Sequence, residues 1–258
     1  MTFLNSDQFN SAIWIMTALA LVVFVVLFFV KAGYGIFRSK QWGLSIPNRV
    51  AWVLMEAPAF CIFVAMWFAS DCGFSMPGAV FGMLFLLHYF QRSFIFPLLI
   101  KGKSRMPIAI MLMGMVFNTV NAVLLFHGFF IHAPQAYAQG AAFLYRPMTI
   151  IGIAVFFLGM GINLHSDHVI RHLRKPGDTR HYLPQKGMYK YVTSGNYFGE
   201  VLEWTGLAIA SCSPAAWLFV WWTFANLAPR AVAINKQYRA EFGETAVGSR
   251  KSIIPFIF

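Results

Sequence analysis

The chain has 258 residues, of which 59% are hydrophobic, 17% aromatic and only 11% charged. Because about a quarter of the residues of a soluble domain are normally charged, this composition excludes a soluble globular domain and indicates a polytopic membrane protein. The 20 Lys and Arg exceed the nine Asp and Glu and give a net charge of +11. We attribute this excess to membrane topology and not to nucleic acid binding.

Seven apolar segments are candidates to cross a bilayer, which takes about 20 mostly apolar residues per helix. In chain order they are 11–31, 50–69, 77–100, 107–131, 147–165, 197–212 and 214–233. The last two are separated only by a turn signal at 211–214. The first lacks the basic start and cleavage site of a signal peptide, so we expect it to be retained. We therefore predict an all-α integral membrane protein, with residues 1–258 forming a single seven-helix domain.

Basic residues lie in alternate loops of this arrangement. They follow the first, third and fifth segments and recur in the C-terminal tail, whereas the other loops hold only Asp71 and Arg146. Since cytoplasmic loops carry an excess of Lys and Arg, the pattern predicts an N-terminus outside and a C-terminus in the cytosol. The pattern is equally consistent with a bacterial inner membrane and with the endoplasmic reticulum.

Polar residues of the segments gather in their cytosolic halves. Glu56 lies early in the second segment, which enters from the cytosol, and Tyr89 and Arg92 lie late in the third, which returns to it. The same half holds Asn163, His165, Asp167, Asn196, Glu200, Glu203 and Arg230. Intramembrane ionisable residues are costly and are by default candidates for function. We therefore predict a polar pocket that opens to the cytosol beneath an apolar chamber.

The sixth segment begins with the stretch NYFGEVLEW (196–204). Asn196, Glu200 and Glu203 are spaced i, i+4 and i+7, so they share one face of a helix. We expect Asn196 and Glu200 to face a ligand. Glu203, one turn deeper, is expected to be hydrogen-bonded to another helix.

The loop before this segment suits a phosphorylated cofactor. Arginine and lysine side chains that can bind phosphate oxygens occur at Arg171, Arg174, Lys175 and Arg180. An alternative interpretation is that these residues only set topology, and we prefer it for Lys175. The run 159–161 lacks the third glycine of a dinucleotide-binding loop, so a Rossmann site is not expected. No metal-ligand spacing occurs, so we expect no metal site.

Several motifs together resemble the steroid 5α-reductase family over residues 33–258. They are GYG (33–35), AWVLMEAP (51–58), HYFQR (88–92), LGMGINLHSDHVIRHLRKPG (158–177), LPQKGMYKYV (183–192), NYFGEVLEW (196–204), PRA (229–231) and RKSIIPFIF (250–258). The resemblance implies seven transmembrane helices. It also implies NADPH-dependent reduction of the C4–C5 double bond of a Δ4-3-oxosteroid.

The resemblance also implies roles for individual residues. Glu56 and Tyr89 correspond to the pair that binds the 3-keto oxygen, in a pocket with Trp52, Met55 and Trp204. The positions that line the NADPH site correspond to Asn163, Asp167, Arg174, Asn196, Glu200, Arg230 and Tyr238. Lys103 lies in a segment matching a cofactor-contacting loop. For Arg92, a cofactor role and a structural pairing with a carboxylate carry equal weight.

The residues suit this chemistry independently of the resemblance. Hydride addition to a conjugated C=C places developing negative charge on the carbonyl oxygen, which a Tyr hydroxyl supported by a carboxyl group can stabilise. A charged Glu56 would be costly in an apolar span, so we expect it to be neutral and able to donate a hydrogen bond. The rival interpretation is that Glu56 pairs with Arg92 and steadies two helices.

Other functions stay open at this point. Met55 stands where steroid-reducing members of the family commonly carry Gln, so an enoyl-thioester or polyprenal-type reductase is the nearest alternative. A transporter and a lipid methyltransferase are alternatives from other classes. The partners we expect are the bilayer and a lipid substrate that enters from it, with no nucleic acid and no obligate protein partner.

Overall fold

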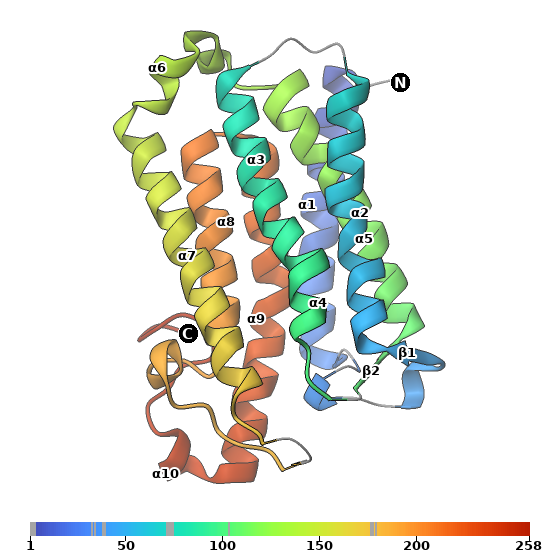
Figure 1. The fold of residues 1–258 in the computed structure, drawn as a ribbon, viewed down its shortest axis with the longest axis vertical. Coiled ribbons are helices and arrows are strands. Elements are labelled where there is room, and N and C mark those ends of the chain that lie inside the picture. The colour runs from blue at the N-terminus through green and yellow to red at the C-terminus, as the bar shows by residue number, and fades with distance from the viewer. Residues whose placement is uncertain are drawn as a thin grey trace.

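Long helices dominate the computed structural model, which describes residues 4–31, 33, 35–37, 40–70, 75–102, 104–175, 178 and 180–258. In Figure 1 they run side by side as one bundle, and α1 begins at the end opposite to α10. The long helices are α1 (Ser6–Phe29), α2 (Asn48–Ala69), α3 (Met76–Phe90), α5 (Ile108–Phe126), α7 (Pro147–Arg171), α8 (Gly195–Ser211) and α9 (Pro214–Phe242).

Short elements connect these helices. A π-helical turn (Gln91–Ile95) joins α3 to α4 (Phe96–Leu99), and another (His127–Ile131) extends α5. The remaining short helices are α6 (Ala141–Leu144), α10 (Glu244–Val247) and the 3₁₀ turns Gly35–Phe37, Lys40–Trp42, Gln135–Gln139 and Gly187–Lys190. Strands β1 (Ser45–Pro47) and β2 (Arg105–Pro107) form an antiparallel pair in which Ile46 lies opposite Met106.

Five helical stretches of the described residues are long and apolar enough to cross a membrane: α1, α2, α3 through α4, α5 with its π turn, and α7. This confirms an all-α membrane protein. α8 and α9 pack into the same bundle, but α8 is only 17 residues long and α9 continues to Phe242, beyond the apolar stretch predicted to end at 233. Seven spans and the orientation of the termini stay predictions.

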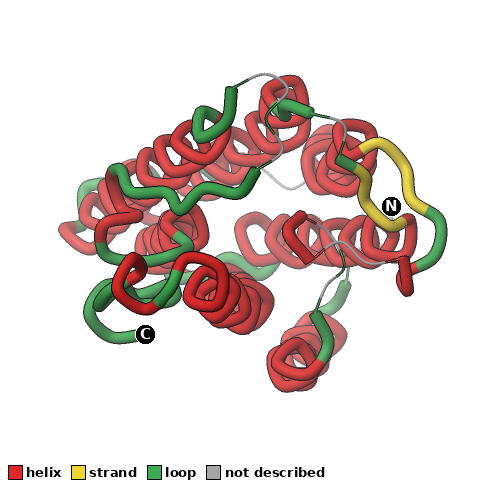
Figure 2. The backbone as a smooth tube through the Cα atoms, turned by 90° about the horizontal axis from the view of Figure 1, so that it is seen from below, coloured by secondary structure: helices red, strands yellow, loops and turns green. Residues whose placement is uncertain are grey.

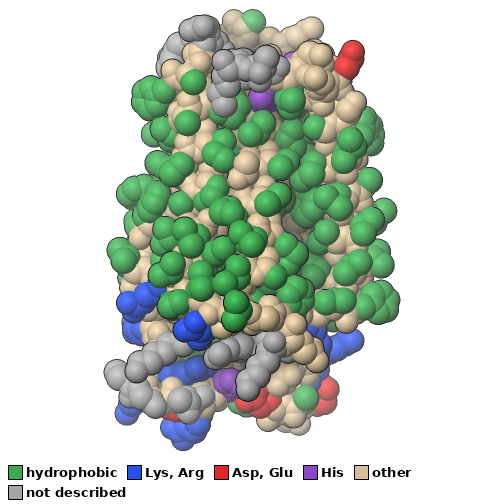
Figure 3. Space-filling view, turned by 90° about the vertical axis from the view of Figure 1, so that its right-hand side faces the viewer, with side chains coloured by type: hydrophobic (Ala, Val, Ile, Leu, Met, Phe, Trp, Pro, Cys, Tyr) green, Lys and Arg blue, Asp and Glu red, His purple; other side chains and the backbone are tan. Residues whose placement is uncertain are grey.

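The surface has an apolar belt with a basic end. Figure 3 shows hydrophobic side chains over most of one face, with Lys and Arg gathered at the lower end. Among the belt residues, Phe29 and Phe68 are 82% and 89% exposed. Such a continuous exposed apolar surface is typical of a lipid-facing protein.

Glycines bring α7 and α8 into backbone contact. A Cβ atom at Gly159 would lie 2.2 Å from the backbone nitrogen of Glu203, and one at Gly199 would lie 2.4 Å from that of Asn163. Gly152 and Gly206 make the same kind of approach one heptad away. Small residues at a membrane helix interface allow close packing of this type, which here places the polar residues of the two helices side by side.

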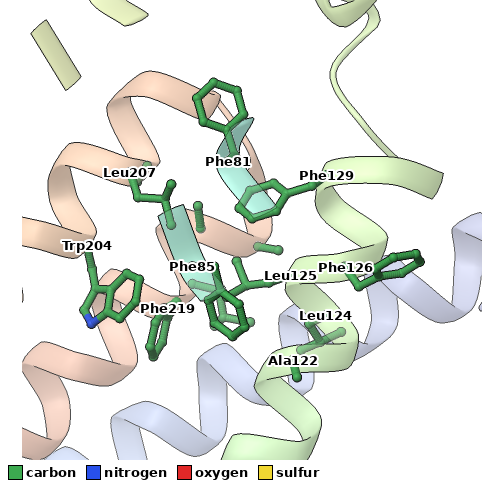
Figure 4. Packing of buried hydrophobic residues seen from close by; sticks show 14 of the residues in the cluster. Phe81, Phe85, Ala122, Leu124, Leu125, Phe126, Phe129, Trp204, Leu207 and Phe219 are labelled. Carbon is green, nitrogen blue, oxygen red and sulfur yellow. The ribbon is translucent and has the colours of Figure 1, made fainter. Parts of the chain in front are cut away.

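Aromatic side chains fill the centre of the bundle. Figure 4 shows Phe81 and Phe85 of α3 between Trp204 and Phe219 on one side and residues of α5 on the other. Phe85 is fully buried, and its ring centroid lies 4.9 Å from that of Phe63 on α2. This packing places α3 against α2, α8 and the π-helical turn that extends α5.

The loops of the basic end are tied to one another. The β1–β2 pair joins the loop before α2 to the loop before α5, and the view from below in Figure 2 shows it on the side of this end away from the C-terminus. The C-terminal tail pairs with the loop before α8 through the backbone of Val192 and Lys251. Loops that the sequence predicts on one side of a membrane therefore lie together.

Candidate active site

α3 and the π-helical turn that follows it carry three polar side chains into the bundle. His88, Tyr89 and Arg92 are 4%, 3% and 8% exposed. Because a helix turns about 100° per residue, Tyr89 points away from His88, whereas Arg92, one turn after His88, also faces α8. His88 reaches α8, Tyr89 reaches α5, and Arg92 reaches α7 and α8.

Tyr89 and Glu56 are joined through a third residue, Asn118 of α5. The Tyr89 hydroxyl donates to Asn118 Oδ1 at 3.0 Å, and Asn118 Nδ2 donates to Glu56 Oε2 at 3.1 Å. The same Nδ2 lies 2.8 Å from the backbone oxygen of Met55, which accepts from it. Tyr89 and Glu56 therefore belong to one hydrogen-bond network. Asn118, which bridges them, was not predicted. The available signal was an asparagine in the middle of an apolar segment.

Arg92 forms the centre of a buried charged cluster. Its Nη1 lies 3.1 Å from Asp167 Oδ2 on α7, and its Nη2 lies 3.7 Å from Glu200 Oε2 on α8. The guanidinium also covers the ring of Trp52 at 4.7 Å and that of Phe96 at 4.5 Å. The structural role expected of Arg92, pairing with a carboxylate, is confirmed, and its partners are Asp167 and Glu200. The rival interpretation, in which Arg92 forms an ion pair with Glu56, is wrong, because Glu56 is hydrogen-bonded to Asn118 instead.

Amide groups extend this cluster between α7 and α8. Asn163 Nδ2 donates to the backbone oxygen of Asn196 at 2.9 Å, and Asn196 Nδ2 donates to Asp167 Oδ1 at 3.1 Å. The Tyr189 hydroxyl lies 3.4 Å from Asn196 Oδ1. Burial raises the pKa of the Tyr189 phenol well above its ordinary value, so it acts as a neutral donor. Tyr189 was not predicted, because the loop that carries it has no helical periodicity.

Glu203 and His88 form a separate buried pair. Glu203 Oε1 lies 2.8 Å from His88 Nδ1, and the Glu203 side chain is fully buried. This confirms the prediction that Glu203 is hydrogen-bonded to another helix. The pair holds α3 against α8 next to Tyr89.

The predicted pocket aromatics differ in their surroundings. Trp204 is 1% exposed, and its ring centroid lies 4.4 Å from those of His88 and Phe219 and 6.1 Å from that of Tyr89. Trp52 is half-buried beneath Arg92. Trp204 therefore contacts His88 beside Tyr89, and Trp52 contacts Arg92, so both rings border the polar network.

Met55 lies on the side of α2 that faces α5. A Cβ atom at Gly114 would lie 2.5 Å from Met55 Cγ, so the glycine makes room for this side chain. The Met55 thioether therefore packs against α5, and only its backbone oxygen takes part in the polar network.

Other predicted cofactor residues lie nearer the basic end. Arg230 of α9 donates from Nε to the Tyr197 hydroxyl at 2.8 Å, and Tyr238 is half-buried against Phe242. Arg174 is exposed just beyond the end of α7. Lys103 lies outside the described residues. The structure thus unites Asn163, Asp167, Asn196 and Glu200 of α7 and α8 with Arg92, and Arg230 joins α9 to α8 through Tyr197.

Several buried polar atoms of this region make no hydrogen bond to a described residue. They are Ser93 Oγ, Asn121 Nδ2, Ser166 Oγ, Ser194 Oγ, Glu203 Oε2 and Trp204 Nε1. Buried polar groups are normally hydrogen-bonded, so this concentration is typical of a ligand site. Carboxylates and amides at Asp167, Glu200, Asn163 and Asn196 form a donor and acceptor set that fits the hydroxyl and carboxamide groups of a nucleotide cofactor.

An apolar belt around a buried network of Tyr, Asn, Glu and Arg side chains defines an integral membrane protein with a site for acid–base chemistry. The family model described as 3-oxo-5-alpha-steroid 4-dehydrogenase matches residues 104–258. Relatives named 3-oxo-5-alpha-steroid 4-dehydrogenase 1 are 36% identical in Bos taurus, over 93% of both chains, and 37% identical in Mus musculus, over 93% of this chain and 92% of the relative. The chain belongs to this family of membrane oxidoreductases.

A relative that is numbered 2 in its name is similar to this chain to the same extent. The human protein named 3-oxo-5-alpha-steroid 4-dehydrogenase 2 is 37% identical over 88% of both chains. The similarity therefore extends over nearly the whole bundle and includes the helices that carry the polar network.

Proposed function

We propose that the protein reduces the C4–C5 double bond of a Δ4-3-oxosteroid with a hydride from NADPH. The observation that carries the proposal is the hydrogen-bonded chain from Tyr89 through Asn118 to Glu56, placed beside the aromatic face of Trp204. The relatives' names, which specify a 3-oxo steroid and its 4-position, support the same reaction.

Tyr89 and Glu56 stabilise the charge that develops during this reaction. When bound, NADPH supplies the hydride to C5, and negative charge builds on the 3-keto oxygen. The Tyr89 hydroxyl donates to that oxygen, and a neutral Glu56 supports it from α2. Such donors act strongly in a buried site because no water competes for the oxygen. The α-carbon C4 then takes a proton from solvent or from a nearby donor.

The cofactor is held between α7, α8 and the basic end. Asp167 and Glu200 accept hydrogen bonds from ribose hydroxyls, and Asn163 and Asn196 bind amide or hydroxyl groups. Arg92 orients the two carboxylates from the π-helical turn after α3. Arg174, Arg230 and Lys103 would bind the phosphates of the cofactor, with Tyr238 alongside. Hollows at this end are lined by Lys31, Phe37 and Arg230 in one case and by Arg49, Ser104 and Arg105 in the other.

The proposed membrane orientation follows from the position of the cofactor site near the basic end of the bundle. All seven long helices span the bilayer, the N-terminus lies outside, and the basic end with its cofactor site faces the cytosol. The steroid enters from the bilayer. The gathering of the basic loops at one end of the bundle supports this orientation.

Incubation of the purified full-length protein with NADPH and testosterone or progesterone tests the proposal. Mass spectrometry should detect a product two hydrogens heavier, reduced at C4–C5. Tyr89→Phe serves as the inactive control. Absence of any reduced steroid in the presence of correctly folded protein would contradict the proposal, and turnover of an enoyl thioester or polyprenal instead would identify the alternative substrate class.

A further inference from the structure

Asn118 uses every polar atom of its side chain between α2 and α3. Its Nδ2 donates to Met55 O at 2.8 Å and to Glu56 Oε2 at 3.1 Å, and its Oδ1 accepts from the Tyr89 hydroxyl at 3.0 Å. The side chain is 4% exposed, so water does not replace these partners. An asparagine amide has two N–H donors and one acceptor oxygen, and all of them are engaged here.

The backbone oxygen of Met55 fixes the orientation of this amide. A carbonyl oxygen can only accept a hydrogen bond, so the amide nitrogen must face α2 and the amide oxygen must face Tyr89. Rotating the amide by 180° would place two oxygens against each other and leave both buried without a donor, which is strongly unfavourable. The Tyr89 hydroxyl is therefore forced to donate, and Glu56 Oε2 is forced to accept.

A second amide on α5 lies near the same hydroxyl. Asn121 is 6% exposed and follows Asn118 by one turn, so both project from the same face of the helix. Its Nδ2 makes no hydrogen bond to another described residue. Of the helices that surround Tyr89, α5 is thus the one that determines the direction of its hydroxyl proton.

We propose that Asn118 is a positioning residue for the reduction, an inference that rests on the proposed function. Before the ketone binds, its amide holds the Tyr89 hydroxyl and the Glu56 carboxyl in one hydrogen-bond direction. Glu56 Oε2 is occupied by Asn118, so the other carboxyl oxygen, Oε1, is the one that faces the substrate carbonyl. When the ketone arrives, its oxygen replaces Asn118 Oδ1 as the acceptor of the Tyr89 proton, while Asn118 Nδ2 keeps its hydrogen bonds to Met55 O and Glu56 Oε2 and so continues to orient the Glu56 carboxyl.

Two substitutions separate this role from simple packing. Asn118→Leu keeps the branched shape and the number of heavy atoms and removes both hydrogen-bond functions, so the Tyr89 hydroxyl and Glu56 lose their alignment. Asn118→Asp keeps an acceptor for Tyr89 but places a second carboxyl group against Glu56. Thr119→Val is the matched control, because the neighbouring Thr119 hydroxyl bonds only the Met115 backbone oxygen of its own helix.

We expect Asn118→Leu to lower kcat by about 10- to 100-fold, because misalignment of a reacting group by about 1 Å costs up to this factor. The KM for NADPH should stay within about twofold of wild type, since the cofactor residues lie on α7 and α8. Thr119→Val should keep wild-type kcat. An unchanged kcat in Asn118→Leu would overturn the proposal.

The pH profile of Asn118→Asp distinguishes positioning from packing. Two adjacent carboxyl groups cannot both be ionised at low cost, and an ionised Asp at position 118 would bind the Tyr89 hydroxyl more tightly than an amide does. Acidification adds a proton to this pair, because two adjacent carboxyl groups share one readily, and should raise kcat of the variant relative to wild type. Asn118→Leu should keep the wild-type pH profile. If both variants lose activity with the same pH dependence, Asn118 acts through packing alone.

A spectroscopic measurement tests Asn118 independently of the substrate. In infrared difference spectra of the full-length protein, the Glu56 carboxyl band is identified by its loss in Glu56→Gln. Removal of the amide donor in Asn118→Leu should shift this band, whereas Thr119→Val should not. If wild type reduces no steroid, the proposed function fails while this band still decides the role of Asn118, and an unshifted band would refute it.

Discussion

Arg92, in the π-helical turn after α3, donates from Nη1 to Asp167 Oδ2 on α7 at 3.1 Å, and both side chains are at most 10% exposed. The same guanidinium lies 3.7 Å from Glu200 on α8. One arginine therefore connects three helices through charges that water does not screen. Removing one member of a buried pair leaves the other as an uncompensated charge.

Arg92→Leu should therefore lower the free energy of unfolding by about 3–5 kcal/mol. Thermal unfolding in a single detergent gives the measurement. Arg180→Leu is the control, because the Arg180–Asp178 pair lies on the surface with the arginine 77% exposed, and surface pairs contribute little. Equal unfolding temperatures for Arg92→Leu and wild type would show that the cluster does not hold the helices together.

Tyr89→Phe should reduce kcat/KM by about 10²–10³-fold, the effect of losing one donor to a developing oxyanion. Glu56→Gln, which retains a donor, should keep more activity than Glu56→Ala. The double variant should lose less than the product of the single losses, because both residues act on one oxygen. NADPH binding should survive every change.

Tyr137→Phe is the matched control for Tyr89→Phe. Tyr137 is also buried, but its hydroxyl donates to the backbone oxygen of Ser211, outside the network of Tyr89. Both substitutions remove one buried phenol hydroxyl. Wild-type turnover in Tyr89→Phe would exclude the mechanism, whatever the result for Tyr137→Phe.

NADPH should be preferred to NADH, because arginine binds the additional phosphate that only NADPH carries. Arg174→Ala should raise the KM for NADPH and leave the KM for NADH nearly unchanged, as steady-state kinetics with each cofactor would show. Lys175→Ala is the control, since Lys175 is equally exposed beyond α7 and is assigned to topology. Equal effects of the two substitutions would remove Arg174 from the site.

Gly159→Ala should separate α7 from α8 and destabilise the protein. The added Cβ atom would lie 2.2 Å from a backbone nitrogen, and a backbone cannot move aside as a side-chain tip can, so a cost of about 1–3 kcal/mol is expected. Gly161→Ala on the same helix is the control, because nothing lies within 4 Å of its Cβ position. Thermal unfolding should show a lower midpoint for Gly159→Ala alone.

Much of the fold could be predicted from local properties of the chain. The hydropathy of each segment depends only on its own residues, so α1, α2, α5 and α7 were expected close to their observed positions. The turn predicted at 211–214 is present, with Cys212 in the left-handed conformation (φ 53°) after α8. The length of α9 was underestimated, because a helix can continue beyond the apolar stretch where its polar residues face solvent.

The composition of the network was also accessible from the sequence. An arginine and three carboxylates in apolar segments are costly enough to indicate function, so Arg92, Glu56, Asp167 and Glu200 could be named without a structure. Their helical spacing could assign residues to faces, as it did for Glu203. The resemblance to a family then assigned roles to the same positions.

Only the tertiary structure decided which of these residues meet. Arg92 faces Asp167 and Glu200 rather than pairing with Glu56, Glu203 meets His88, and Asn118 bridges Glu56 and Tyr89. Hydropathy and periodicity depend on neighbours along the chain, but a hydrogen bond depends on the rotation and separation of two helices. Those are determined by the glycine contacts of α7 with α8 and by the aromatic packing around α3, which form only when distant segments come together.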